Sequence, residues 1–133
     1  MLFRKLLFAQ FFVLATVASL YIVGMLLYLN WTFWWYDIVL HLLGGVWVAL
    51  AVSTVLVRFA RQPTLVHCIL GIAVVGVLWE LFEVAVGMPR EANYALDTSI
   101  DLLMDVLGSI MGFLFIRRTV PSEMRGTITP HDQ

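Results

Sequence analysis

The chain has 133 residues, of which 62% are apolar and 13% are charged, and its formal net charge is −1. A soluble domain has about 45–50% apolar and about 25% charged residues, so this composition points to lipid rather than water as the main solvent. The near-neutral charge gives no electrostatic reason to expect a nucleic-acid partner. A single cysteine, Cys68, excludes a disulfide within the chain.

Four apolar segments are long enough to cross a bilayer, which takes about 20 helical residues. The expected helices cover residues 6–29, 37–57, 65–86 and 98–116. The first is longer than a signal-peptide core, so we expect it to be retained as a membrane helix. Short connections favour antiparallel neighbours. The sequence therefore predicts an all-α, up-down four-helix membrane bundle over residues 1–118 and a flexible cytoplasmic tail over residues 119–133.

The basic residues predict how this bundle is oriented. Seven of the eight fall on one side of the four predicted helices: Arg4, Lys5, Arg58, Arg61, Arg117, Arg118 and Arg125. Arg90, between the third and fourth segments, is on the other side. Lys and Arg are enriched in cytoplasmic connections, so both termini are expected in the cytoplasm.

Acidic residues favour the opposite, outer half of the predicted bundle. Seven of the nine fall there: Asp37, Glu80, Glu83, Glu91, Asp97, Asp101 and Asp105. Glu80 and Asp105 each lie about two turns inside a predicted helix, roughly 10 Å from its end. An acid at the centre of a membrane helix costs about 2.5–3.5 kcal/mol on insertion scales, and such residues usually mark functional sites.

Helical spacing places these acids on shared faces. Asp37 and His41 are four residues apart, and Glu80 and Glu83 are three apart. The three acids of the fourth segment form a row at four-residue intervals, and Asp97 also suits the N-cap of that helix. Glycines extend the same faces, and a GxxxG pair in the fourth segment lets helices approach closely: Gly108 and Gly112. We therefore expect three polar faces to meet near the outer surface.

Several carboxylates in one low-dielectric site cannot all be ionised unless protons or cations neutralise them. One interpretation is a divalent metal site for Mg²⁺, Mn²⁺, Ca²⁺ or Zn²⁺. Its candidate ligands are Asp37, His41, Glu80, Glu83, Asp101 and Asp105. The other interpretation is carboxyl pairs that share protons and act in acid–base catalysis, with Glu80, Asp101 and Asp105 as candidate catalytic residues. Arg90 is a candidate ligand for an anionic headgroup or phosphate.

The dispersed residues also resemble a known pattern between about residues 36 and 112. The matching motifs are Asp37-x3-His41, Trp79-Glu80-x2-Glu83 and Asp101-x3-Asp105-x2-Gly108-x3-Gly112. They resemble the VanZ-like superfamily, and most closely its YjdF-like bacterial inner-membrane relatives, which implies a location in the bacterial inner membrane. Ile38, Glu83 and Asp105 stand where Lys, Gln and Asn are common in VanZ-like proteins. The two extra acids make this site richer in metal ligands than the usual form.

Three kinds of function follow from these observations. The first is a metal- or carboxyl-dependent enzyme that acts on a lipid or lipid-linked envelope precursor at the outer leaflet. The second is binding or transport of a cation, a proton or a cationic compound. Transport would require acids in the inner halves of the predicted helices, and the sequence has none there. The third is an accessory subunit whose acids meet a basic partner.

Overall fold

The computed structural model describes residues 2–87 and 93–119. Within these residues the structure is all helical, with no strand. Its four long helices are α1 (Leu2–Leu26), α3 (Trp35–Arg58), α4 (Leu65–Val86) and α5 (Tyr94–Thr119), and a short helix, α2 (Leu29–Thr32), follows α1. Each long helix has the length and apolar content to cross a membrane. The predicted all-α class is confirmed, and a four-helix membrane bundle fits this architecture. Of the predicted tail, residues 120–133 lie outside the described residues.

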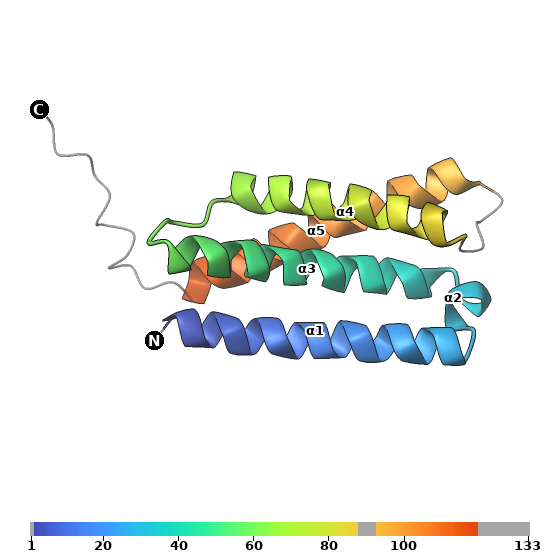
Figure 1. Cartoon of the computed structure of the whole chain (residues 1–133), viewed down its shortest axis with the longest axis horizontal. Helices are drawn as coiled ribbons and strands as arrows, with labels where there is room; N and C mark the ends of the chain where they lie inside the picture. Colours follow the sequence, from blue (N-terminus) through green and yellow to red (C-terminus); the bar gives the residue numbers. More distant parts are fainter. Residues whose placement is uncertain (1, 88–92, 120–133) are drawn as a thin grey trace, which may run out of the picture.

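Successive long helices run in opposite directions (Figure 1). The α3 helix is central, because it contacts α1, α4 and α5, and its contact with α5 is the most extensive in the bundle. In Figure 1, α1 lies along one side of α3 and α4 along the other. The bundle therefore consists of an α3–α5 pair with α1 and α4 as flanking helices.

The end of α1 differs from the sequence expectation. The helix ends at Leu26, three residues before the predicted boundary, and α2 was not predicted. Tyr28 between them has a left-handed backbone with φ of 56°. Non-glycine residues rarely adopt this conformation. Residues 26–29 contain no glycine or proline, so the sequence gave no signal of a helix break here. The largest differences elsewhere are the starts of α1 and α5, each four residues earlier than expected.

The limits of α4 follow from its capping residues. The Oγ1 of Thr64 accepts a hydrogen bond from the backbone N–H of His67, which satisfies one free amide of the first turn. Gly87 ends the helix with a left-handed backbone, φ of 71°, which glycine adopts without steric cost. Glu80, a buried residue of α4, accepts hydrogen bonds from α5, and this contact brings α4 into the site described below.

The α3 and α5 helices approach each other most closely at glycines. A Cβ on Gly108 would collide with the backbone carbonyl of Leu42, and a Cβ on Gly45 would collide with the carbonyl of Asp105. Gly112 continues this contact one turn further along α5. Only glycine fits where two helix backbones lie this close. The predicted GxxxG pair therefore lies at the α3–α5 contact.

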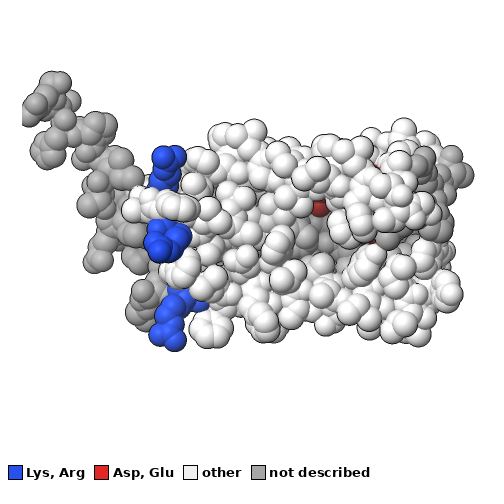
Figure 2. All heavy atoms as spheres, in the orientation of Figure 1, with Lys and Arg blue, Asp and Glu red and all other residues white. Residues whose placement is uncertain are grey.

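Charges separate along the length of the bundle. The basic residues of the described chain lie at the end where α1 begins and where α3 and α5 terminate (Figure 2). The described acids lie in the other half, and the few acidic atoms that Figure 2 shows are recessed below the surface. A hydrophobic core cluster lies at the basic end: Leu6, Ala49, Leu50, Cys68 and Ile116. The functional candidates therefore belong to one half of the bundle.

Candidate metal centre

The first turns of α3 provide two neighbouring side chains. Asp37 lies in the first turn, where a carboxylate interacts favourably with the helix dipole. His41 lies one turn later on the same face, and its Nε2 is 3.7 Å from Oδ2 of Asp37. The Asp37 side chain is 35% exposed and that of His41 is 7% exposed. The pair therefore joins a solvent-accessible carboxylate to a buried imidazole.

The first half of α5 adds two buried carboxylates. Asp101 and Asp105 are one turn apart and are 4% and 5% exposed. Oδ1 of Asp105 lies 3.3 Å from Nδ1 of His41, across the contact between α3 and α5. A Cβ on Gly76 of α4 would lie 2.6 Å from Oδ2 of Asp105, so this glycine leaves room for the carboxylate. Three helices thus determine where Asp105 sits.

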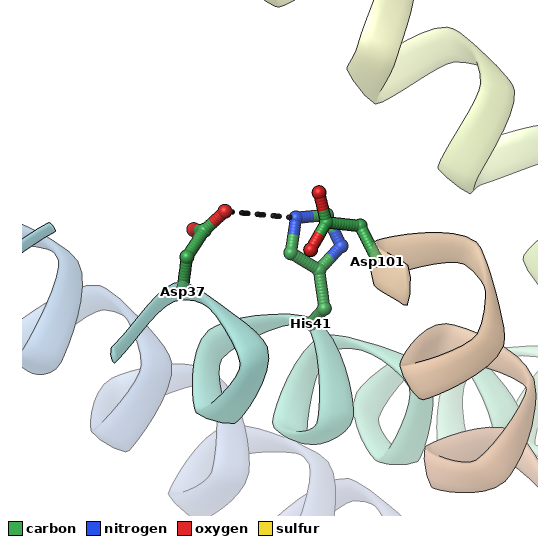
Figure 3. A group of neighbouring side chains, drawn as sticks. All are labelled: Asp37, His41 and Asp101. Atoms are coloured by element: carbon green, nitrogen blue, oxygen red, sulfur yellow. Dashed lines mark ion pairs between the residues drawn. The ribbon is translucent and has the colours of Figure 1, made fainter. Parts of the chain in front are cut away.

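One atom each of Asp37, His41 and Asp101 lie within 4.8 Å of one another (Figure 3). We call these three residues the Asp–His–Asp trio. In proteins, metal–ligand distances run from about 2.0 Å for transition metals to about 2.4 Å for Ca²⁺, so two ligands on opposite sides of an ion are about 4–4.8 Å apart. The trio is therefore compact enough to surround one cation.

The histidine of the trio has a carboxylate at each ring nitrogen. Asp37 is at Nε2, and Asp105 is at Nδ1. A metal-binding histidine typically donates its second N–H to a carboxylate, which fixes the ring orientation and makes the free nitrogen a stronger ligand. Asp105 occupies the position of that supporting carboxylate, next to the trio.

Glu80, a predicted ligand and catalytic residue, makes its hydrogen bonds to α5. Its Oε2 accepts a hydrogen bond of 2.8 Å from Oγ1 of Thr98 and one of 3.4 Å from the hydroxyl of Tyr94. Its Oε1 is buried with no hydrogen-bond partner within residues 2–87 and 93–119. The sequence analysis did not single out Thr98 or Tyr94. Thr98 lies three residues before Asp101, so helical spacing would have identified it.

The remaining candidates are Glu83, which is not a member of the trio, and Arg90. Glu83 is partly exposed, and its Oε1 accepts a hydrogen bond of 2.9 Å from Nε1 of Trp79, one turn earlier on the same helix. Arg90, the predicted anion ligand, lies outside the described residues. The spacing of Glu80 and Glu83 therefore predicted a shared face, and the structure gives them different surroundings.

A cavity of about 290 Å³ opens beside the trio, between α1, α3 and α4. Asp37, His41, Glu83 and Asp105 are the titratable groups at its polar end, together with Tyr21. The rest of its lining is mostly apolar and comes from all three helices: Leu14, Val17, Ala18, Leu40, Gly44, Trp47, Val48, Ile72, Val75, Gly76 and Trp79, with Asn30 from α2. The cavity thus has both polar and apolar lining residues, and we call it the α1–α4 groove.

Comparison with protein families agrees with this architecture. Residues 3–121 match the family described as "Predicted membrane protein (DUF2238)", and the match spans all four long helices. The chain belongs to this family. YjdF-like is a name of the DUF2238 family, so this part of the resemblance is confirmed, whereas the wider VanZ-like assignment stays a prediction. No curated protein and no solved structure matches the chain. Membership of the DUF2238 family therefore establishes a membrane protein, and the chemistry rests on the residues of the site.

Proposed function

We propose that this DUF2238 protein binds a divalent cation through Asp37, His41 and Asp101 and uses it to act on a lipid or lipid-linked envelope precursor. Asp105 positions His41 in this proposal. The single observation that carries it is the placement of His41, with Asp105 3.3 Å from Nδ1 and Asp37 3.7 Å from Nε2. A proton on Nδ1 leaves the Nε2 lone pair directed toward the other two members of the trio.

Charge supports a cation at this position. Asp101 and Asp105 are buried at 4% and 5% exposure, and Asp37 is close by. Buried carboxylates are strongly unfavourable when they lack a compensating charge, and their mutual repulsion adds to this cost. A divalent cation would neutralise two of these charges and would be held between the carboxylates of Asp37 and Asp101 and the imidazole of His41.

The donor set favours particular cations. Mg²⁺ and Ca²⁺ prefer sites made only of oxygen atoms, whereas an imidazole nitrogen suits Mn²⁺ and Zn²⁺. Two carboxylates and one imidazole leave further coordination positions for water or a substrate oxygen. A cation held there would supply Lewis-acid chemistry to that oxygen, and a carboxylate of Asp101 or Asp105 would be the group that accepts a proton. We therefore expect Mn²⁺ or Zn²⁺ to bind more tightly than Mg²⁺ or Ca²⁺.

The proposed orientation places the site in the outer half of the bacterial inner membrane, with both termini in the cytoplasm. The basic residues at the end of the bundle where α1 begins support it, because such residues are enriched on the cytoplasmic side. Reporter fusions check this orientation: a cytoplasm-active reporter at residue 119 should be active, and a periplasm-active one should be silent. The opposite pattern would invert the proposed topology.

Transport through the bundle is the weaker candidate. The hydrophobic cluster at the basic end of the bundle consists of Leu6, Ala49, Leu50, Cys68 and Ile116, and the buried polar residues near it on α3, Ser53 and Thr54, are not ionisable. Within the described residues Asp105 is one turn beyond Asp101 toward that end, and no carboxylate lies beyond it. Ion and proton pathways in membrane proteins are lined by polar or ionisable side chains, so a pocket open to one side fits these contacts better than a channel.

Titration of the full-length, detergent-solubilised protein tests metal binding. After treatment with a chelator, the protein is titrated calorimetrically with MnCl2, ZnCl2, CaCl2 and MgCl2. We expect one ion per chain and a loss of at least tenfold in affinity for Asp101→Asn. The Asp97→Asn variant is the matched control, since it removes the same charge from the same helix outside the trio. The absence of binding by the wild type, or equal losses in both variants, would refute the proposal.

A further inference from the structure

The α1–α4 groove lies along α3, between α1 and α4. Its walls are α1 and α4, and its floor includes Leu40, Gly44 and Val48 of α3. Figure 1 shows α1 and α4 on opposite sides of α3, and Figure 2 shows acidic atoms recessed in a hollow of this face. All four long helices are apolar enough to span a membrane, so in a bilayer the apolar part of a groove between two of them would face lipid.

Polarity changes from one end of the groove to the other. Asp37, His41 and Glu83 line the end near the trio, and Leu14 and Ile72 line the opposite end. Along α3 the lining extends from residue 37 to residue 48, a rise of eleven residues and about 16 Å at 1.5 Å per residue. A ligand that fits this groove has a polar head and an extended apolar chain.

We propose that the groove holds one acyl chain of a glycerophospholipid, whose phosphate reaches the cation at the Asp–His–Asp trio. This inference rests on the proposed function, because the carboxylates alone would repel a phosphate. A cation with open coordination positions reverses that repulsion, since phosphate oxygens are good ligands for Mn²⁺ and Mg²⁺. The bilayer supplies such a lipid directly through the open side of the groove.

Trp47 favours an ester-linked lipid over a plain hydrocarbon chain. Trp47 lines the groove, and its indole Nε1 is buried and has no hydrogen-bond partner within the described part of the chain. A buried N–H without a partner is unfavourable, and side chains on a helix lean toward its N-terminus, here toward His41. Trp47 is six residues beyond His41 on α3, about 9 Å along the helix axis, and its lean toward His41 brings the indole closer to the depth of the ester carbonyl of a lipid whose phosphate is at the trio.

Gly44 provides a way to block the groove without disturbing the bundle. It lines the groove on α3, three residues from His41, and a Cβ built on it meets nothing within 4 Å. A Gly44→Phe variant should therefore fill the groove below the trio while its side chain occupies open space. Ala73→Phe is the matched control, because Ala73 is an exposed residue of α4 outside the groove.

Photolabelling of the Mn²⁺-loaded full chain tests the inference. The probe is phosphatidylglycerol with a diazirine in one acyl chain, and the labelled peptides are mapped by mass spectrometry. We expect labelling to concentrate at groove residues such as Val17 and Val75, to fall at least fivefold when Mn²⁺ is removed, and to fall similarly in Gly44→Phe. The Ala73→Phe control should label like the wild type, and both variants should still bind Mn²⁺.

Two results would overturn the inference in different ways. If the wild type binds Mn²⁺ but labelling is uniform over the lipid-facing surface, or unchanged in Gly44→Phe, the groove does not hold the lipid and only this inference fails. If the wild type binds no Mn²⁺, the proposed function fails together with it.

A second variant tests whether the ester group of the lipid lies at Trp47. The wild type should prefer ester- over ether-linked phosphatidylglycerol by about fivefold, and Trp47→Phe should abolish that preference. An equal preference in both proteins would contradict the role of Trp47.

Discussion

Nδ1 of His41 lies 3.3 Å from Oδ1 of Asp105, so a polar contact of the candidate site crosses the closest helix pair of the bundle. The two features are connected through the backbone. A Cβ on Gly45 would collide with the carbonyl of Asp105. The absence of a side chain at Gly45 therefore determines how closely Asp105 approaches α3. A change in the contact of α3 with α5 would therefore move the carboxylate away from the imidazole. The packing of the bundle and the geometry of the trio depend on each other.

Replacement of Asp105 by asparagine should weaken metal binding without removing a direct ligand of the trio. The amide keeps the size of the side chain and an oxygen that accepts a hydrogen bond from Nδ1 of His41, but it loses the charge. Loss of such a supporting carboxylate typically costs about 10–100-fold in metal affinity. Calorimetric titration with MnCl2 measures the change, and Asp97→Asn should shift affinity by less than about threefold. An Asp105→Asn protein with wild-type affinity would show that Asp105 does not support His41.

Glycines with different surroundings should respond differently to a methyl group. Gly108→Ala should destabilise the bundle by about 1–3 kcal/mol, because the new Cβ would collide with the carbonyl of Leu42. Gly44→Ala should be neutral or slightly stabilising, since its Cβ enters open space and alanine is the better helix former. Equilibrium unfolding in mixed detergent micelles, followed by circular dichroism, compares the two. Equal losses would contradict the close α3–α5 approach.

The four long helices could be predicted because length and apolar content largely decide whether a segment spans a bilayer. The convergence of acids from α3 and α5 also followed from spacing, since residues four apart share a helix face. Spacing does not determine how each helix is rotated about its axis. Glu80 and Glu83 show the consequence: Glu80 is 8% exposed and bonded to Thr98, whereas Glu83 lies in the groove beside Trp79. The rotation of α4 is set by packing against α5, which local sequence does not encode.

The groove was beyond sequence reasoning for a similar physical reason. Its walls come from segments far apart in the chain, and its apolar lining looks like ordinary membrane-helix sequence. Gly44 illustrates this, because Gly44 and Gly45 are adjacent and chemically identical. A Cβ on Gly45 would strike α5, and a Cβ on Gly44 would meet nothing within 4 Å. Only the arrangement of the helices separates a packing glycine from one that lines a cavity.

Thr98→Val should separate the structural role of Glu80 from a role in metal binding. Valine has nearly the shape of threonine but removes the 2.8 Å hydrogen bond to Oε2 of the buried carboxylate. Loss of a partner by a buried acceptor costs about 1–3 kcal/mol, so the unfolding free energy should fall by that amount. Ser99→Ala is the control, because its hydroxyl is exposed and bonds only to Ala95 of its own helix. Mn²⁺ affinity should not change in either variant; a loss in Thr98→Val alone would place Glu80 in the metal site.

Acid should weaken metal binding, because protons and the cation compete for the same atoms. The trio binds a cation only with both carboxylates ionised and with His41 Nε2 free of a proton. Affinity should therefore rise between about pH 5 and pH 8, by about tenfold per pH unit for each proton that binding displaces. Titrations in two buffers with different ionisation enthalpies count the protons released. The His41→Gln variant retains a polar side chain but cannot titrate, so its affinity should be lower and should vary less steeply with pH. An affinity for Mn²⁺ that is equal at both ends of this range would exclude the trio as the binding site.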